Sequence, residues 1–179
     1  MSSGVLVTGF EAWGEHPVNP SQLVAERLGG VVLPVSYTRA ADALRAAIDE
    51  RDPKLVIAFG LAESRGKVSV ERFAHNLDEA SQVDDDATSG SGAEIDPAGP
   101  LALRSTLPVD AIVAALNEAG IPAEVSRDAG GFLCNHVFYR LLQVREGGFV
   151  HVPPLDVLPE DELLRAAELV VATARGRSS

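Results

Sequence analysis

The residue best suited to chemistry in this sequence is its single cysteine, Cys134. It follows the glycine pair Gly130-Gly131 and lies near the start of an apolar run that is typical of a helix. The pattern therefore predicts Cys134 in the first turn of a helix, where unpaired N–H groups and the helix dipole stabilise a thiolate and can hold an oxyanion. The alternative is a structural cysteine, because a free cysteine packs well as a small apolar side chain.

A cysteine nucleophile needs a base, and the chain has four histidines. His136 lies two residues after Cys134 on the same predicted helix, so their side chains point away from each other. His16 falls in an aromatic loop and His75 on an expected strand. His151 lies at the carboxyl end of a short predicted strand, which is the edge where open α/β sheets collect their active sites. His151 is therefore the candidate base, and the residues alone leave the alternative of a core histidine satisfied by the backbone equally open.

The third member of such a site should be a carboxylate that orients the imidazole. Glu71 is a candidate because it places a charge in the middle of an expected strand. The residues alone favour the alternative, which is a solvated outer strand face on which Glu71 pairs with Arg72.

Length and composition bound the class of protein. The 179 residues fit one domain, 1–179, and two domains would be poorly filled. With 15 Lys and Arg against 26 Asp and Glu, the net charge of -11 argues against a nucleic-acid partner. No apolar run is long enough to span a bilayer and no signal peptide is seen, so we expect no membrane partner and a cytoplasmic location. One cysteine excludes an intrachain disulfide and a cysteine-based zinc site.

Apolar segments typical of strands alternate with segments typical of helices. Strands are expected at residues 5–8, 31–35, 55–59, 68–76, 123–126 and 149–152. Helices are expected at residues 20–28, 40–51, 108–119, 132–143 and 160–175, the first with Asn19 as its cap and Gln22 reaching back. This order predicts an α/β fold around a largely parallel sheet. The polar stretch 78–100 is expected as a loop or hairpin, and loops of this length are often functional.

Four segments, in the same order, resemble the signatures of the pyroglutamyl peptidase type I family, whose members are also called pyrrolidone-carboxylate peptidases. They are VLVTGFE followed by NPS near the start, then VERFAHN, AGGFLCNHVFY and FVHVP. Together they span essentially the whole chain, and the cysteine segment is the most specific of them. The resemblance implies a single domain with three layers, α/β/α, around a mostly parallel twisted sheet.

The resemblance also implies a function, that of a cysteine exopeptidase that removes N-terminal pyroglutamate from peptides and needs no metal or cofactor. Cys134 would be the nucleophile that forms a thioester, His151 the general base and then acid, and Glu71 the group that orients His151. Pyroglutamyl peptides are the expected substrate. The segments near residues 28–31 and 139–149 are shorter than is usual in the family, where they contribute to subunit contacts. A homo-oligomer is therefore possible but not implied.

The residues of a substrate pocket are implied by the same resemblance. Phe10 and Trp13 match the aromatic residues that sandwich the lactam ring, although phenylalanine is usual where Trp13 stands. Phe132 and Leu133 match pocket positions beside the nucleophile, and Leu61 stands where the family has a glutamine near the substrate. The alternative for Phe10 and Trp13 is a loop anchored on the core.

The chain departs from the family pattern at Leu61 and at Ser81, where the family commonly has an arginine. Arg65 or Arg72 are candidates to replace that arginine, and the sequence leaves the choice open. Asp84 matches an acidic residue of the family, but the favoured interpretation is a member of a solvated acidic run. Because of these departures at Leu61 and Ser81, an alternative function stays open, in which the protein is a catalytically weak homologue that binds pyroglutamyl peptides. A nucleoside phosphorylase-like enzyme is a third hypothesis, but no convincing phosphate-binding loop supports it.

Overall fold

A six-stranded sheet forms the middle of the structure, a computed structural model that describes residues 4–14 and 17–176. Its strands, in chain order, are β1 (Val5–Phe10), β2 (Val31–Leu33), β3 (Leu55–Leu61), β4 (Val68–Glu71), β7 (Ala123–Ser126) and β8 (Gly147–Val152). They lie side by side in the order β2-β1-β3-β8-β4-β7. Every neighbouring pair is parallel except β4 and β8, which are antiparallel. The predicted mostly parallel α/β fold is confirmed.

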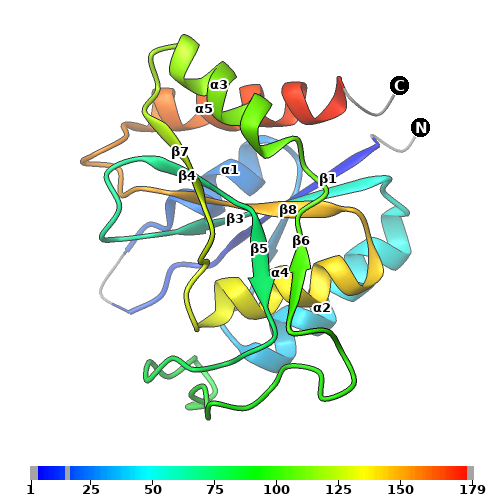
Figure 1. Ribbon diagram of the computed structural model, residues 1–179. Helices are drawn as coiled ribbons and strands as arrows, with labels where there is room; N and C mark the ends of the chain where they lie inside the picture. Colours follow the sequence, from blue (N-terminus) through cyan, green and yellow to red (C-terminus); the bar gives the residue numbers. More distant parts are fainter. Residues whose placement is uncertain (1–3, 15–16, 177–179) are drawn as a thin grey trace.

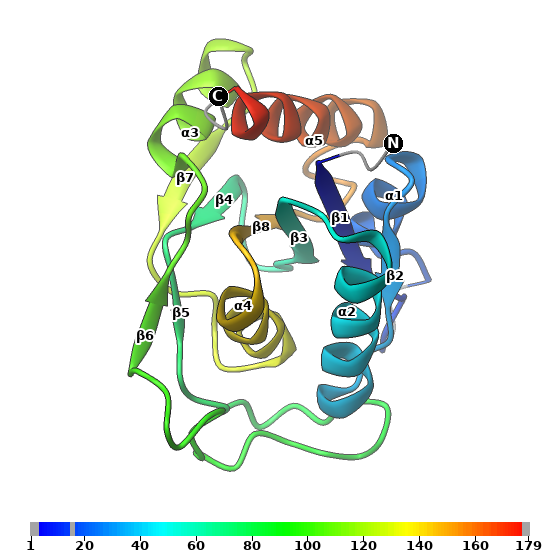
Figure 2. The ribbon, with the colours of Figure 1, turned by 90° about the vertical axis from the view of Figure 1, so that its right-hand side faces the viewer.

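Helices cover both faces of this sheet (Figure 1, Figure 2). On one face lie α2 (Tyr37–Arg51) and α4 (Leu133–Val144), and on the other lie α1 (Pro20–Arg27), α3 (Val109–Glu118) and α5 (Glu160–Arg175). The result is the expected α/β/α arrangement in three layers. None of the helices in the described part of the chain is both long and apolar enough to cross a bilayer.

Burial on both faces explains why the central strands are apolar throughout rather than alternating. In β3, Val56 and Ala58 pack into the apolar cluster under α2 and α4. Their neighbours Ile57 and Phe59 point the other way, into the cluster under α1, α3 and α5. The sheet is therefore held rigidly between two cores, and its strand ends are well-fixed positions for side chains.

The start of α1 is tied to the aromatic loop that precedes it. The Asn19 side chain caps the helix, as predicted, by accepting a hydrogen bond from the Ser21 N–H. Gln22 does reach back, but its side-chain oxygen accepts from the backbone N–H of Ala12 at 3.1 Å. The Ser21 hydroxyl accepts from the Phe10 N–H at 3.0 Å. These bonds fix the end of β1, which carries Phe10, and the start of the loop that carries Trp13.

The strand predicted at residues 68–76 is wrong as one element. It is broken at Arg72 into β4 and β5 (Phe73–His75), and β5 pairs with β6 (Ala102–Arg104) in a separate antiparallel sheet. The break arises because the Arg72 N–H donates to the Ser126 carbonyl, whereas its own carbonyl accepts from the Ser105 N–H. Strand β6 was not predicted, because its three residues are largely exposed and show no apolar alternation.

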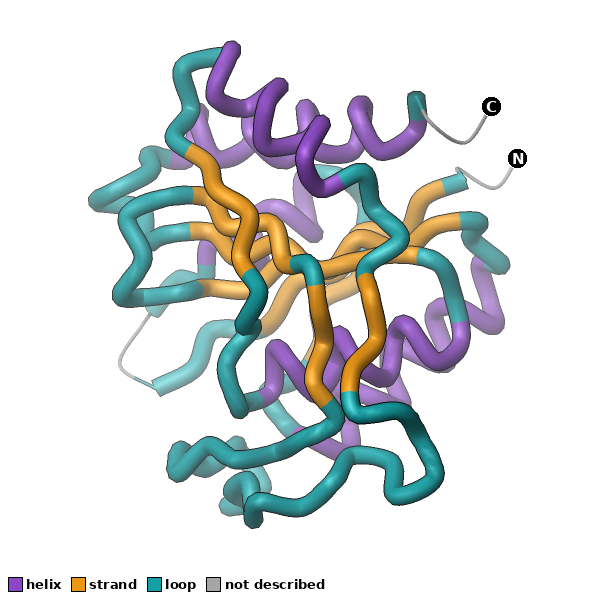
Figure 3. Tube along the Cα trace, viewed as in Figure 1, coloured by secondary structure: helices purple, strands orange, loops and turns teal. Residues whose placement is uncertain are grey.

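The polar stretch between β5 and β6 is a long loop, in agreement with the prediction (Figure 3). It is pinned by two isolated bridges, Asp78 with Ala93 and Val83 with Ser89. Its first residues also contact the segment before α4, since the N–H groups of Glu79 and Ala80 both donate to the Gly131 carbonyl.

Candidate active site

His151 lies at the carboxyl end of β8 and is only 4% exposed. It is paired in register with Gly60 of β3 on one side and with Ser69 of β4 on the other. The parallel strands β3 and β8 end together here, so the side chains that follow them converge on one edge of the sheet.

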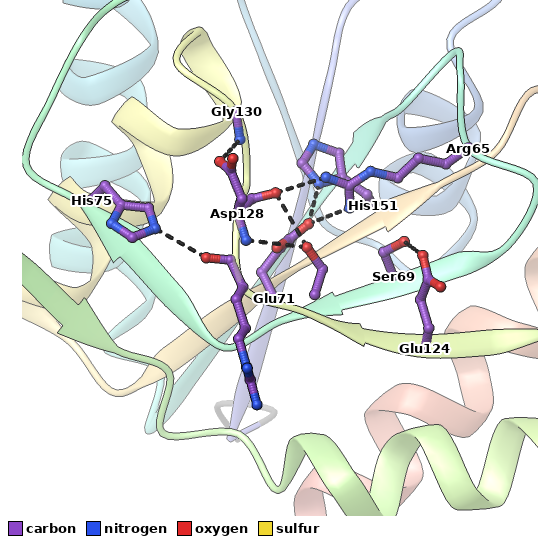
Figure 4. A network of polar contacts seen from close by, with 10 residues as sticks. Arg65, Ser69, Glu71, His75, Glu124, Asp128, Gly130 and His151 are labelled. Carbon is purple, nitrogen blue, oxygen red and sulfur yellow. Dashed lines mark hydrogen bonds and ion pairs between the residues drawn. The ribbon is translucent and has the colours of Figure 1, made fainter.

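Glu71 ends β4 and is fully buried. Its Oε1 lies 2.7 Å from His151 Nδ1 and 2.6 Å from an Nη atom of Arg65 (Figure 4). The solvated strand face favoured from the residues alone is therefore wrong. Arg72, the partner expected on that face, pairs instead with Asp110 at 2.6 Å. Glu71 is buried because β4 is a central strand with neighbours on both sides, and its charge is compensated by the partners it meets there.

Cys134 is the second residue of α4, in the first turn of the helix as predicted. The thiol lies close against Gly60, since a Cβ built on that glycine would be 2.8 Å from Cys134 Sγ and 2.7 Å from Cζ of Phe149. Residues paired in a parallel ladder point to the same face of a sheet. The thiol therefore lies over the same part of the sheet as the His151 side chain, and the structure brings Cys134, His151 and Glu71 together.

A small cavity of about 80 Å³ opens beside the thiol. Its lining includes Cys134 and all five predicted pocket residues, Phe10, Trp13, Leu61, Phe132 and Leu133. Trp13 and Phe132 form one wall, with ring centroids 5.4 Å apart. Phe10 is also anchored on the core, as the alternative interpretation expects, because it is only 4% exposed and lies 6.5 Å from the ring of Phe149.

Three lining residues were missed from the sequence, namely Asn19, Val35 and Glu63. Asn19 was assigned only as a helix cap, and nothing in the local pattern marked the other two. A larger cavity of about 830 Å³ lies elsewhere, between the start of α3 and the end of α4, and it is lined by neither a cysteine nor a histidine. Size alone would thus have identified the wrong place.

Comparisons of the sequence and of the fold with known proteins both find pyroglutamyl peptidases, which are also named pyrrolidone-carboxylate peptidases. The family model for pyroglutamyl peptidase matches residues 3–168. A pyrrolidone-carboxylate peptidase of Klebsiella pneumoniae (strain 342) is 41% identical over 193 residues, covering 99% of this chain and 89% of that protein. The pyroglutamyl peptidase I of Bacillus amyloliquefaciens superposes with a TM-score of 0.92 at 32% identity, covering 98% of each chain. The pyrrolidone carboxyl peptidase from Thermococcus litoralis gives 0.92 at 33% identity, covering 96% of this chain and 93% of that one.

The chain belongs to the pyroglutamyl peptidase family. As a member of this family it is a cysteine omega-peptidase. The nucleoside phosphorylase-like alternative is thereby removed. The family match covers all the segments that carry the cavity and the buried His151–Glu71 pair.

The pKa of the Cys134 thiol is shifted in the opposite direction to the one predicted from its place at a helix start. Burial raises the pKa of the Cys134 thiol from 9.0 to about 12, and the nearby charge of Glu71 adds to the rise, although Arg65 opposes it. Burial also lowers the pKa of His151 from its ordinary value, although its hydrogen bond to the Glu71 carboxylate opposes that shift. Burial thus disfavours the charged forms of both groups, which opposes the thiolate predicted from the helix start.

Two other histidines lie away from the thiol. His136 points away from Cys134, as predicted, and its Nδ1 lies 2.8 Å from a carboxylate oxygen of Asp78. His75 contacts the Arg127 carbonyl through Nε2 at 3.0 Å. His16 lies outside the described residues. Among the described residues, no three His, Cys, Asp or Glu side chains form a group that could hold a metal ion.

The favoured interpretation of Asp84 as part of a solvated run is wrong. Asp84 is only 4% exposed, and its carboxylate accepts hydrogen bonds from the N–H groups of Tyr37, Asp86 and Thr88. It thus ties the long polar loop to the start of α2. Ser81, in the same loop, is exposed and does not line the cavity.

Proposed function

We propose that the chain is an exopeptidase that removes N-terminal pyroglutamate from peptides through Cys134, His151 and Glu71, by way of a thioester. The observation that carries the proposal is a thiol that opens into a small apolar cavity and lies over a histidine paired with a buried carboxylate. Family membership supports the same substrate class.

Acylation begins with attack of Cys134 Sγ on the carbonyl that joins the lactam ring to the next residue. Because His151 Nδ1 is engaged by Glu71, Nε2 is the nitrogen left to take the thiol proton. The negative charge of Glu71 stabilises the imidazolium that results. The oxyanion of the tetrahedral intermediate would be held by the leading N–H groups of α4, which begins without a side-chain cap.

Breakdown of this intermediate cleaves the C–N bond, and the His151 imidazolium gives its proton to the leaving amine. The products are a thioester on Cys134 and a peptide shortened by one residue. His151, neutral again, then takes a proton from water as the oxygen attacks the thioester. Collapse releases pyroglutamate and returns the proton to the thiol.

The cavity explains the choice of a neutral lactam. A pyroglutamyl ring is flat, small and uncharged, so it can pack against Trp13 and Phe132 without the loss of hydration that a charged amino terminus would suffer. An unblocked N-terminal glutamate carries both an ammonium and a carboxylate. The same walls should therefore reject it. We also place the protein in the cytoplasm, where its lone thiol stays reduced.

The test is release of a fluorescent amine from a pyroglutamyl amide, with the matching glutamyl amide as control. We expect turnover of the first and none of the second, and Cys134→Ser should lower kcat on the order of 10⁴-fold or more with the fold retained. A pyroglutamyl aldehyde should be captured reversibly by the thiol as a hemithioacetal. Binding of a pyroglutamyl peptide without turnover or aldehyde capture would establish the weak homologue instead.

A further inference from the structure

Arg65 lies in the turn between β3 and β4, and its side chain is one-quarter exposed. Its guanidinium makes two short contacts with different parts of the site. One nitrogen lies 2.6 Å from Glu71 Oε1, and the other donates to the backbone carbonyl of Asp128 at 2.7 Å (Figure 4). Arg65 does not line the cavity beside Cys134.

The first contact is made to the oxygen that also faces the histidine. Glu71 Oε1 is shared by Arg65 and by His151 Nδ1, whereas Oε2 is buried without a hydrogen-bond partner. Within the described residues, Arg65 is the one arginine or lysine that pairs with this carboxylate. A fully buried carboxylate is held in one orientation only if its partners fix it, and here both partners act on the same oxygen.

The second contact reaches the segment that leads into α4. The Asp128 side chain accepts from the Gly130 N–H at 2.8 Å, and the Gly131 carbonyl accepts from Glu79 and Ala80. Gly130 has a φ of 82°, so this turn has a backbone shape that other residues rarely adopt. By bonding the Asp128 carbonyl, the planar fork of Arg65 links the Glu71 carboxylate to the turn just before Cys134.

We infer that Arg65 is a positioning residue, which orients Glu71 toward His151 and couples that carboxylate to the turn that places Cys134. The inference rests on the proposed function, because it assigns Arg65 a role in the same reaction. Of the two arginines considered in the sequence, Arg65 meets Glu71 and Arg72 is paired with Asp110, and neither of them lines the cavity.

Arg65 should also affect proton transfer. Its charge lowers the pKa of His151 and of Cys134, in both cases against the effect of Glu71. The other charged groups near the pair are Asp128, which raises the pKa of His151, and Glu63, which lines the cavity. On the neighbouring strand, Glu124 accepts a hydrogen bond from the Ser69 hydroxyl and forms an ion pair with Lys67. Removing the Arg65 charge raises both pKa values, so the acid limb of kcat/KM must move to higher pH whichever proton it reports.

Two substitutions of Arg65 separate the effect of its positive charge from the effect of its bonds to both Glu71 and Asp128. Arg65→Gln removes the charge and should shift the acid limb upward, with a fall in kcat of about 10- to 100-fold and little change in KM. Arg65→Lys keeps the charge but cannot hold both Glu71 and Asp128. It should leave the acid limb near its original pH and recover only part of kcat.

The matched control is Arg72→Gln, which removes a neighbouring guanidinium and the same charge. It breaks the ion pair with Asp110, so it should lower the melting temperature while kcat and the acid limb stay near wild type. An Arg65→Gln enzyme with unchanged kcat and pH profile would overturn the inference, as would an equal pH shift in Arg72→Gln. If Arg65→Gln does not fold, a lysine variant with full kcat overturns it equally. Failure of the wild-type protein to cleave pyroglutamyl amides would instead count against the proposed function.

Discussion

Gly60 has no side chain at the point where the thiol of Cys134 and the ring of Phe149 meet β3. An alanine there would place its Cβ within 2.8 Å of the sulfur and 2.7 Å of the ring, so one of them must move. We expect Gly60→Ala to lower kcat by up to about 100-fold and stability by about 1–3 kcal/mol. The measurements are steady-state kinetics and urea unfolding.

Gly66→Ala is the control for this change, because nothing lies within 4 Å of the position where its Cβ would be. It should leave both kcat and the free energy of unfolding close to wild type. Full activity in Gly60→Ala would contradict the placement of the thiol against β3.

The two histidines nearest to Cys134 in the sequence should behave in opposite ways when replaced by alanine. His151→Ala removes the proposed base and should abolish turnover. It also takes one partner from the buried Glu71 carboxylate, so it should cost about 1–3 kcal/mol of unfolding free energy, while Arg65 remains paired with Glu71. His136→Ala leaves the Asp78 carboxylate without its partner, and should cost about 1–3 kcal/mol of unfolding free energy while turnover persists. Steady-state kinetics and thermal melts of both variants test this expectation. A larger loss of turnover in His136→Ala than in His151→Ala would show that the base is misassigned.

Local chemistry identified Cys134 and His151 as candidates because each signal lies within a few residues, in a glycine pair before a helix and a polar residue at a strand end. Glu71 was misread, because its burial depends on β7 and β8, which lie far along the chain. The raised pKa of the thiol was missed for the same reason, since burial cannot be read from the helix start alone. The role of Arg65 depends on two contacts that no spacing predicts.

At the scale of elements, the end of β3 determines which chemical groups the cavity presents to the lactam ring that we propose it binds. Leu61 closes that strand and lines the cavity, where it presents only carbon. Leu61→Gln should supply a polar partner for the ring and lower KM by roughly fivefold, equivalent to about 1 kcal/mol, with kcat nearly unchanged. The comparison is with a cyclopentanecarbonyl amide, whose uncharged ring has no lactam carbonyl or N–H.

Leu61→Met is the matched control for this substitution, because it has similar length and no polar group. It should leave KM for the pyroglutamyl amide as it is. An equal improvement for the pyroglutamyl and cyclopentanecarbonyl amides would show that shape, rather than a new hydrogen bond, is responsible.

The helices and apolar strands were predictable because each carries its own signal, as in the helix α5, whose bounds match the expected residues 160–175. The break between β4 and β5 was not, since the pattern of side chains continues through Arg72. Only the separate partners of its N–H and carbonyl, Ser126 and Ser105, divide the strand. Backbone pairing with distant segments leaves no trace in the local sequence.

At the scale of the whole molecule, the site makes stability depend on pH in two directions. His151 has a lowered pKa in the fold, so the unfolded chain binds more protons below about pH 6.5 and stability falls as the pH drops through that range. Cys134 has a raised pKa, so the unfolded chain loses its thiol proton first and stability falls as the pH rises above 9.0.

Thermal melts across pH should therefore show a maximum between these limits. In Cys134→Ala the decline on the alkaline side should be smaller, while the acid side should be unchanged. An identical alkaline decline in the variant would mean that the thiol is not the group responsible.

The antiparallel contact between β4 and β8 has a consequence for how the molecule assembles. Glu71 and His151 are 80 positions apart in the chain, and they meet only when these two strands pair. Pairings of such long range carry a large entropic cost of loop closure, so they form late compared with helices. During refolding, peptidase activity should therefore return more slowly than the far-ultraviolet circular dichroism signal of the helices, and the delay would time the closing of the sheet.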